Sequence, residues 1–292
     1  MDYGLVLPSM GDDATRDGIE AAAELAERHG FSDVWGTDHI LVDRGAADDY
    51  GRIYEIVTTL AWVAGRFRTV RVGASVVIAP MRNAVLLAKE LATLDDLSEG
   101  RLIVGLGAGW NTVEFANLAM ADRFHVRGPY LEETVALFRH LWSGSREPFN
   151  GRFHQFDDFV FGPLPRRGAD LPIWIGGRNE KALQRVGRLA DAYHSSATSP
   201  ASFAERIPIV RAAAEAAGRP MPRLSGRVRV ELDSEGPAGF YTMHGSPAEV
   251  AGEIRKYAEL GVDHLALAFP ERDRASLTRS IERFVGEVVP LV

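Results

Sequence analysis

The chain has 292 residues, 46% of them hydrophobic, and a formal net charge of -7, so it can bury a sizeable core but offers no basic face of the kind that binds nucleic acid. It contains no cysteine, which excludes disulfides, thiolate metal sites and cysteine nucleophiles, and its eight histidines show no metal-ligand spacing, so we expect no metal. The opening residues lack the basic region of a secretory signal, and no apolar run approaches membrane-spanning length. We therefore expect a cytoplasmic protein that does not contact a membrane.

Short apolar runs typical of buried strands alternate with amphipathic helical runs from one end of the chain to the other. We expect strands at residues 3–7, 33–36, 70–78, 102–106, 172–175, 192–195, 227–232 and 264–269. Helices are expected between them, for example at residues 15–29, 84–97, 180–189 and 247–260. Eight such units in a chain of this length predict an α/β fold, a single (β/α)8 TIM barrel domain over residues 1–292, with its active site at the carboxyl ends of the strands.

Two stretches interrupt this alternation. Residues 144–167 are rich in glycine, proline and aromatic residues and are too long for a simple connection, so we expect an ordered insertion before the fifth strand. Residues 233–245 follow the seventh strand and contain three glycines that could act as hinges, which makes them a candidate lid. No linker or low-complexity tract divides the chain, which favours one domain.

The second expected strand ends in the sequence WGTDHI, which places Asp38 and His39 at the rim where the active site of such a barrel lies. A histidine can donate or accept a proton near neutral pH, and a neighbouring carboxylate can hold a ligand hydroxyl or orient the imidazole. This combination suits redox chemistry on a ring cofactor. The alternative is that the pair only caps the segment that follows.

Gly105, Gly107 and Gly109 follow one another at alternating positions as the fourth strand ends, and glycine permits close backbone approach to a ligand. Their G-x-G-x-G spacing lacks the final glycine of the dinucleotide fingerprint, and no G-x-x-x-x-G-K-[ST] loop occurs in the chain. A tight turn is the structural alternative. In the context of the neighbouring motifs, we expect a flavin-like ligand to meet the protein here.

The fifth strand ends in a glycine pair, Gly176 and Gly177, followed by Arg178 and Asn179 before a helix begins. Exposed backbone amides at the amino end of a helix, with an arginine nearby, suit a phosphate group. The alternative is an ordinary tight turn between strand and helix.

A series of motifs follows in order along the chain: GLVLP, WGTDH, ASVVIAPMRN, LDDLSEGRLIVGLGAGWN with Glu114-Phe115 after it, Arg127-Gly128, FDDFVFGPLP, PIWIGG and GVDHLAL. With these motifs the chain resembles the bacterial luciferase-like (β/α)8 flavin and deazaflavin oxidoreductases over almost its whole length. The Asp-His pair looks like the branch that depends on the deazaflavin coenzyme F420. The resemblance implies a hydride transfer between that coenzyme and an organic substrate, and it suggests a homodimer.

The resemblance also assigns roles to individual residues. It implies that Asp38 contacts the edge of the coenzyme ring, that His39 is the proton donor, and that Ser75-Val76 is a non-proline cis peptide whose bulge supports the ring. The residues implied to line the coenzyme are Ala108, Gly109 and Asn111, and those implied to hold its phosphate are Gly176, Gly177 and Asn179. Two alternatives stay open: a monooxygenase that uses FMN reduced by a separate partner reductase, and a barrel that binds a flavin without turnover.

One departure from the family restricts the substrate. The deazaflavin glucose-6-phosphate dehydrogenases carry a catalytic glutamate where this chain has Trp110, and a tryptophan cannot accept a proton. We therefore expect a small-molecule substrate that is an apolar or conjugated carbonyl, alkene or alcohol. Trp110, Phe240 and Tyr241 would form the apolar wall of its pocket.

Overall fold

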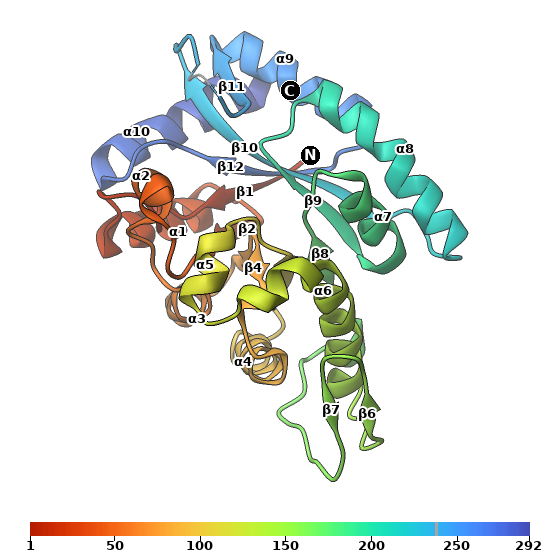
Figure 1. Cartoon of the computed structure of the whole chain (residues 1–292). Helices are drawn as coiled ribbons and strands as arrows, with labels where there is room; N and C mark the ends of the chain where they lie inside the picture. The colour runs from red at the N-terminus through yellow and green to blue at the C-terminus, as the bar shows by residue number, and fades with distance from the viewer. Residues whose placement is uncertain (237–238) are drawn as a thin grey trace.

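The computed structural model describes residues 1–236 and 239–292, and eight parallel strands in it close into a barrel. These strands are β1 (Asp2–Val6), β2 (Asp33–Gly36), β3 (Arg71–Ala74), β5 (Leu102–Gly107), β8 (Ile173–Ile175), β9 (Ala192–Ser196), β10 (Arg223–Leu232) and β12 (His264–Ala268). They pair in chain order, and β12 closes the barrel by pairing with β1 (Figure 1). The predicted (β/α)8 barrel is confirmed.

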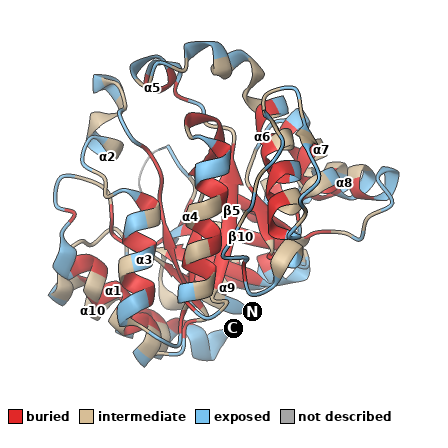
Figure 2. Cartoon of the chain, turned by 90° about the horizontal axis from the view of Figure 1, so that it is seen from below, coloured by how far each residue is buried: buried red, intermediate tan, exposed pale blue. Residues whose placement is uncertain are grey.

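The helices surround the barrel and turn their buried faces towards the strands (Figure 2). The longer ones are α1 (Arg16–Arg28), α3 (Ile56–Arg66), α4 (Ala84–Leu97), α6 (Ala121–Trp142), α7 (Glu180–Leu189), α8 (Pro200–Ala216), α9 (Pro247–Glu259) and α10 (Arg274–Arg283). Asn83, Asn179 and Ser246 cap α4, α7 and α9 by accepting a hydrogen bond from a first-turn backbone amide. These caps explain why the predicted helix starts agree with the structure. Within the described residues, no helix is long and apolar enough to cross a membrane.

Large aromatic side chains fill the inside of the barrel. Trp35 is fully buried there with Trp174, and their ring centroids lie 5.1 Å apart. Gly73 and Gly4 make room for Trp35, because a Cβ atom at Gly73 would lie 2.6 Å from the indole ring and one at Gly4 would lie 2.7 Å from its Nε1. The interior is therefore closely packed, and polar groups inside it must find partners within the protein.

The prediction of one continuous strand at residues 70–78 is wrong. β3 ends at Ala74, and β4 (Val77–Ile78) pairs separately with β5. Between them the Ser75-Val76 peptide bond is cis, as the resemblance predicted. We call residues 75 and 76 the Ser75–Val76 bulge.

The seventh strand is also longer than expected. β10 begins at Arg223, four residues before the predicted start, because residues 223–227 pair with β9 on one side. Residues 242–245 of the candidate lid form β11 (Thr242–Gly245), which pairs with β10. Residues 237 and 238 of the candidate lid lie outside the described residues, and its opening and closing stay a prediction.

The expected insertion at residues 144–167 is ordered and contains a small antiparallel hairpin, β6 (Phe149–Asn150) and β7 (Gln155–Phe156). The Glu133 carboxylate on α6 accepts hydrogen bonds from the backbone amides of Arg152, Phe153 and His154. Further along, the backbone amide of Arg166 donates to Asp95 on α4 at 2.8 Å. The insertion thus packs along the outside of α4 and α6 (Figure 1).

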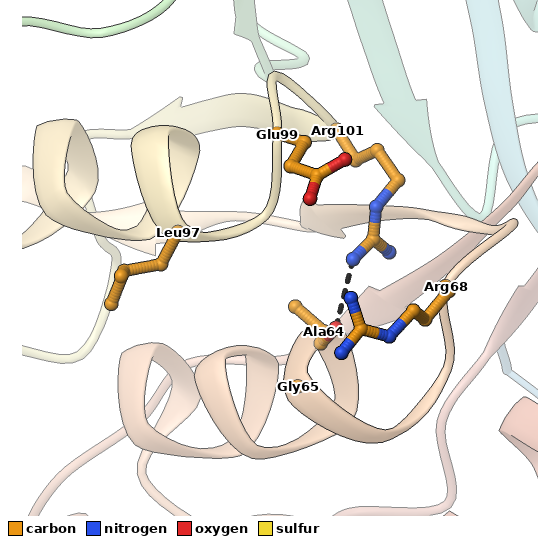
Figure 3. Close-up of a pocket in the computed structure, with 6 residues that line it drawn as sticks. All are labelled: Ala64, Gly65, Arg68, Leu97, Glu99 and Arg101. Carbon is orange, nitrogen blue, oxygen red and sulfur yellow. Dashed lines mark hydrogen bonds between the residues drawn. The ribbon is translucent and has the colours of Figure 1, made fainter.

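The amino end of β5 is held by Arg101, the arginine of the LSEGR motif. Its guanidinium donates to the backbone carbonyls of Ala64, Phe67, Val70 and Ser98 at 2.7–2.9 Å. Figure 3 shows this group above the end of α3, in a small pocket that Arg68 and Glu99 also line. Because the guanidinium donates to four carbonyls of the protein itself, the motif at this end of the strand serves the fold.

Candidate active site

The carboxyl ends of the barrel strands form one face, which we call the carboxyl face, and the predicted site residues follow several of these ends. Asp38 and His39 follow β2, the Ser75–Val76 bulge follows β3, residues 108–111 follow β5 and residues 176–179 follow β8. Because all eight strands are parallel, these segments meet at the same end of the barrel.

His39 is buried, with 6% of its surface exposed, and it is oriented by a carboxylate that the sequence analysis did not assign to the site. Its Nδ1 lies 2.7 Å from Oε2 of Glu114 on α5 (Thr112–Asn117). The other carboxylate oxygen of Glu114 accepts hydrogen bonds from the backbone amides of Ile40 and Leu41. A carboxylate on Nδ1 fixes that nitrogen as the donor and leaves Nε2 to face a ligand.

Glu114 is fully buried and still held as an anion. Burial raises the pKa of this carboxyl, but the hydrogen bonds from His39 and from the backbone amides of Ile40 and Leu41 outweigh it, so that the pKa is lowered overall. An ionised Glu114 can stabilise a positive charge on His39 when the imidazole accepts a second proton. This is the electrostatic arrangement that a general base requires.

Two aromatic side chains surround His39. Tyr50, at the end of the short helix α2 (Ala47–Tyr50), has its ring centroid 4.2 Å from the imidazole, and Trp110 lies edge-on at 5.7 Å. Trp110 is 56% exposed, so most of its ring is available to a ligand. The aromatic rings give the base an apolar surrounding on the side that remains open.

The Asp38 carboxylate accepts hydrogen bonds from other groups of the protein. Its Oδ2 accepts the backbone amide of Ile78 at 2.8 Å, and its Oδ1 accepts Arg82 Nη2 at 2.6 Å. Burial raises the pKa of this carboxyl, and the charge of Arg82 opposes that rise only in part. In this structure Asp38 therefore ties the end of β2 to the segment that follows the bulge, and its contact with a coenzyme ring stays a prediction.

Ser75 is fixed by three hydrogen bonds. Its backbone amide donates to the carbonyl of Gly36 at 2.8 Å, and its carbonyl accepts Arg227 Nη1 at 2.8 Å. Its hydroxyl lies 2.8 Å from Nε2 of His194. Arg227, on β10, was not part of the predicted site, because a single arginine in a strand carries no local signal for such a contact.

The glycines in the last part of β5 make room for the bulge and the residue before it, which the sequence analysis did not anticipate. A Cβ atom at Gly105 would lie 1.7 Å from the carbonyl oxygen of Ala74, and one at Gly107 would lie 2.5 Å from a methyl group of Val76. Gly109 has a φ of 79°, which favours glycine. Ala108 and Gly109 are partly exposed at the carboxyl face, so they are available to a ligand, whereas the two preceding glycines are buried.

Asn111 begins α5 rather than facing an open surface. It is 3% exposed, its Oδ1 accepts the backbone amide of Val113 at 3.0 Å, and its Nδ2 donates to Asp43 at 2.8 Å. It also accepts from the amide of Glu114 at 3.2 Å, so it positions the helix that carries this glutamate. Its predicted role as a coenzyme contact is untested, and the contacts observed give it a role in capping.

The predicted phosphate residues lie where β8 passes into α7. Asn179 caps α7 by accepting the amide of Ala182 at 2.9 Å, and Arg178 is exposed, with one hydrogen bond to the carbonyl of Ser196 at 2.7 Å. Gly177 must be glycine for packing reasons, because a Cβ atom there would lie 2.4 Å from that of Ala182. Gly176 is partly exposed beside it. The helix start and the arginine are thus accessible to an anion.

Phe240 and Tyr241 are not among the aromatic rings that pack against His39. The Arg178 guanidinium lies 5.7 Å from the centre of the exposed Phe240 ring, which puts Phe240 at the predicted phosphate site. The hydroxyl of Tyr241 donates to Glu253 on α9, so this side chain packs against a helix. Trp110 is the one predicted wall residue that the structure places against His39.

One buried polar atom at the carboxyl end of β2 lacks a partner within the described part of the chain, and a ring ligand could supply one. Thr37 lies between Gly36 and Asp38 at the end of β2, is 5% exposed, and its Oγ1 has no hydrogen-bond partner among the described residues. A buried hydroxyl without a partner is unfavourable, and the carbonyl or ring nitrogen of a flavin-like ligand would supply one. Among the same residues, no group of three or more histidine and acidic side chains could hold a metal ion.

Comparison with known proteins agrees with this geometry. The model of the luciferase-like monooxygenase domain matches residues 1–233, so the chain belongs to the luciferase-like monooxygenase family. It is 25% identical over 315 residues to the F420-dependent glucose-6-phosphate dehydrogenase of Kineococcus radiotolerans, with 92% of this chain and 91% of the relative covered. It is 28% identical over 215 residues to the F420-dependent hydroxymycolic acid dehydrogenase of Mycobacterium tuberculosis, with 73% of this chain and 58% of the relative covered.

Among solved structures, an F420-dependent secondary alcohol dehydrogenase in complex with an F420-acetone adduct matches with a TM-score of 0.82. Its sequence is 18% identical, and 100% of this chain and 99% of that chain are covered. At this identity the match shows the shared fold. The family and the barrel predicted from the sequence motifs are both confirmed, and the relatives agree with the expected deazaflavin branch.

Proposed function

We propose that the protein is a coenzyme F420-dependent oxidoreductase that transfers a hydride between the coenzyme and an organic substrate. The observation that carries the proposal is the buried pair of His39 and Glu114, which leaves Nε2 of the imidazole open at the same face as the Ser75–Val76 bulge. Two relatives of this chain are named as F420-dependent, which supports the same coenzyme.

The coenzyme ring would rest on the Ser75–Val76 bulge, with Ala108 and Gly109 beside it and the Thr37 hydroxyl within reach of its polar edge. Its phosphate would lie at the start of α7, held by the backbone of Gly176 and Gly177 and by the side chain of Arg178. Asn179 caps this helix at the amide of Ala182, and the remaining amides of its first turn would meet the anion. Asp38 and Asn111 act by holding the segments that form the ring site.

The bound coenzyme supplies the hydride acceptor or donor. For an alcohol substrate, His39 accepts the hydroxyl proton at Nε2 while the hydrogen on the same carbon leaves as hydride, so that a carbonyl forms. In the reverse direction His39 returns the proton to the carbonyl oxygen. Glu114 holds the imidazole in the required tautomer and stabilises its protonated form throughout.

The surroundings of His39 favour an apolar substrate. Trp110 and Tyr50 present aromatic surface to the space above the imidazole, and neither supplies a charge for a sugar phosphate. We therefore propose an apolar or conjugated alcohol, carbonyl or alkene as the substrate class. Turnover of a panel of secondary alcohols and enones, with glucose 6-phosphate as the comparison, tests this class; preference for the sugar phosphate would contradict it.

Fluorescence titration of the purified protein with F420 and with FMN tests the coenzyme. We expect F420 to bind at least about tenfold more tightly, a difference of about 1.4 kcal/mol. Equal or reversed affinities would point to the FMN-dependent monooxygenase, which would need a separate reductase. A homodimer and a cytoplasmic location stay predictions, and light scattering of the purified protein checks the first of them.

A further inference from the structure

A continuous chain of buried side chains crosses the inside of the barrel and ends at the bulge. It consists of Ser75, His194 on β9, Ser225 on β10, His264 on β12 and Asp33 on β2. All five side chains are at most 7% exposed. None of the last four was part of the predicted site.

The chain is connected by four close contacts. Ser75 Oγ lies 2.8 Å from His194 Nε2, and His194 Nδ1 lies 2.7 Å from Ser225 Oγ. Ser225 Oγ lies 2.7 Å from His264 Nδ1, and His264 Nε2 lies 2.9 Å from Asp33 Oδ1. Every ring nitrogen and hydroxyl in the series therefore has a partner at hydrogen-bond distance.

Asp33 determines which group donates in its contact with His264. Its carboxylate accepts from Trp35 Nε1, from the Ser32 hydroxyl and from Arg71 Nη2. Burial raises the pKa of Asp33, but the hydrogen bond with His264, with smaller contributions from Ser32 and Arg71, outweighs it and lowers the pKa to about 2, so the group is an anion and can only accept. His264 must therefore donate from Nε2.

The remaining directions follow from the valence of each group. Arg71 also pairs with Asp33, and with His264 in the neutral form its Nδ1 accepts the proton of the Ser225 hydroxyl. Ser225 Oγ accepts in turn from Nδ1 of His194. Burial lowers the pKa of His194 well below its usual value, so this imidazole is neutral and its Nε2 accepts the proton of Ser75.

We propose that His194 is a positioning residue for the Ser75–Val76 bulge, held in its Nδ1-protonated form by a one-way hydrogen-bond chain that begins at Asp33. The Ser75 hydroxyl then points its proton into the barrel, while the backbone amide and carbonyl of the same residue are held by Gly36 and Arg227. His194 is itself held in place by stacking on Trp35, with ring centroids 4.6 Å apart and planes 15° apart. This inference rests on the proposed function insofar as the bulge supports the coenzyme.

The proposal would be overturned if the hydrogen bonds of this chain ran in the opposite direction. If His264 carried a second proton, its Nδ1 would donate to Ser225, Ser225 would donate to His194, and His194 would donate from Nε2 to Ser75. The two arrangements differ in the tautomer of His194 and in the charge of His264. Both are observable in the protein without any coenzyme.

The first experiment is a long-range ¹H–¹⁵N NMR correlation on the ¹⁵N-histidine-labelled protein, with assignments from His194→Gln and His264→Gln. We expect two neutral rings, His194 protonated at Nδ1 and His264 protonated at Nε2. A His194 ring protonated at Nε2, or a charged His264, would overturn the polarity. This result does not depend on which coenzyme the protein binds.

The second experiment tests positioning with matched serine variants. Ser225→Ala removes the middle of the chain without touching Ser75, whereas Ser98→Ala removes a hydroxyl of similar burial that donates to the carbonyl of Asp95 and is not part of the chain. We expect Ser225→Ala to raise the Kd for F420 about fivefold or more, the size of one lost hydrogen bond, and Ser98→Ala to leave it within about twofold.

Thermal unfolding of both variants checks that each is folded before Kd values are compared. Equal Kd values for folded Ser225→Ala and Ser98→Ala would overturn the positioning role. Failure of the proposed function has a different signature, because the wild-type protein itself would then bind FMN in preference to F420. In that case the same pair of variants is titrated with FMN, since Ser225 acts on the bulge rather than on one particular ring.

Discussion

The two ends of strand β5 carry equally clear sequence motifs, LSEGR before the strand and GLGAGWN after it, but they serve different purposes. Before the strand, Arg101 donates to four backbone carbonyls and the motif joins α3, α4 and β5. At the end of the strand Gly107 accommodates the bulge, and beyond it Trp110 is exposed and Asn111 starts the helix that brings Glu114 to His39.

This difference follows from the geometry of the barrel. At the amino end of β5 the chain arrives from α4, and the guanidinium of Arg101 is satisfied by backbone carbonyls of the protein. At the carboxyl ends the loops leave groups such as Nε2 of His39 open to a ligand. Substitutions at the amino end of β5 should therefore change stability, and those around its carboxyl end should change ligand binding and rate. The following predictions test that separation.

The largest expected effect is at the carboxyl face. His39→Ala should lower turnover about 10²–10⁴-fold, the usual contribution of a general acid or base, while the Kd for the coenzyme stays within a few fold. The physical reason is that Nε2 is the open nitrogen of a ring that Glu114 orients. Steady-state rates and a separate binding titration measure the two quantities.

The control for this prediction is His39→Gln, which keeps a hydrogen-bonding group but cannot titrate. If proton transfer is the role of His39, the glutamine variant should be no more active than the alanine variant. A fully active glutamine variant would show that His39 only packs against the coenzyme, and the search for the proton donor would move to Asp38 or to a bound water.

The next largest effect is at the opposite end of β5. Arg101→Met keeps the aliphatic part of the side chain but leaves the carbonyls of Ala64, Phe67 and Val70 without this donor. We expect a loss of about 2–4 kcal/mol in the free energy of unfolding, with coenzyme affinity unchanged. Urea unfolding and coenzyme titration check both parts. A stable variant with weakened coenzyme binding would contradict the separation of the two ends.

The sequence was sufficient for features with a local signal. The start of α4 at Ala84 could be predicted because Asn83 is a good cap before an apolar periodic run, and β2 agrees with its predicted bounds of residues 33–36. The cis peptide at Ser75-Val76 came from the family resemblance and is confirmed, because its motif is specific. The placement of His39 at the end of β2 also followed from the order of elements.

Contacts between distant residues could not be predicted in this way. Glu114 lies 75 residues from His39, and nothing in the local spacing connects them. The capping of α5 by Asn111 was missed in the same way: this residue was assigned only to the coenzyme by resemblance, a contact that stays a prediction, and it also positions Glu114. The chain through His194 and Ser225 likewise depends on strand register, which the sequence does not specify.

A smaller effect concerns acid stability at the amino end of β2. The folded-state pKa of Asp33 is lowered to about 2, so its contribution to stability is complete above about pH 4 and is lost as the pH falls through 2. From the shift below the usual 3.8, this contribution is about 2 kcal/mol. Asp33→Asn should therefore be less stable at neutral pH and lose less stability on acidification. Urea unfolding at about pH 6 and about pH 3 measures the loss of unfolding free energy on acidification. If the variant lost as much as the wild-type protein, other carboxylates would be responsible for the loss.

The smallest expected effects come from a pair of glycine substitutions, one near each end of the barrel. In Gly107→Ala the new Cβ atom would lie 2.5 Å from a stiff, β-branched Val76, so the bulge must shift. Overpacking of this kind typically destabilises the folded protein by about 1–3 kcal/mol. Because Val76 forms part of the proposed ring support, we also expect coenzyme binding to weaken, by about tenfold or less.

Gly65→Ala is the matched substitution at the amino end, in the pocket of Figure 3. It lies exposed in α3 with no atom within 4 Å of the new Cβ, so the higher helix propensity of alanine should raise stability by about 0.5 kcal/mol. Coenzyme affinity should not change. Comparison of the two variants by melting temperature and titration is informative because both add one methyl group. If Gly107→Ala altered only the melting temperature, or if Gly65→Ala altered coenzyme affinity, ligand binding and folding would not be separated between the two ends of the barrel.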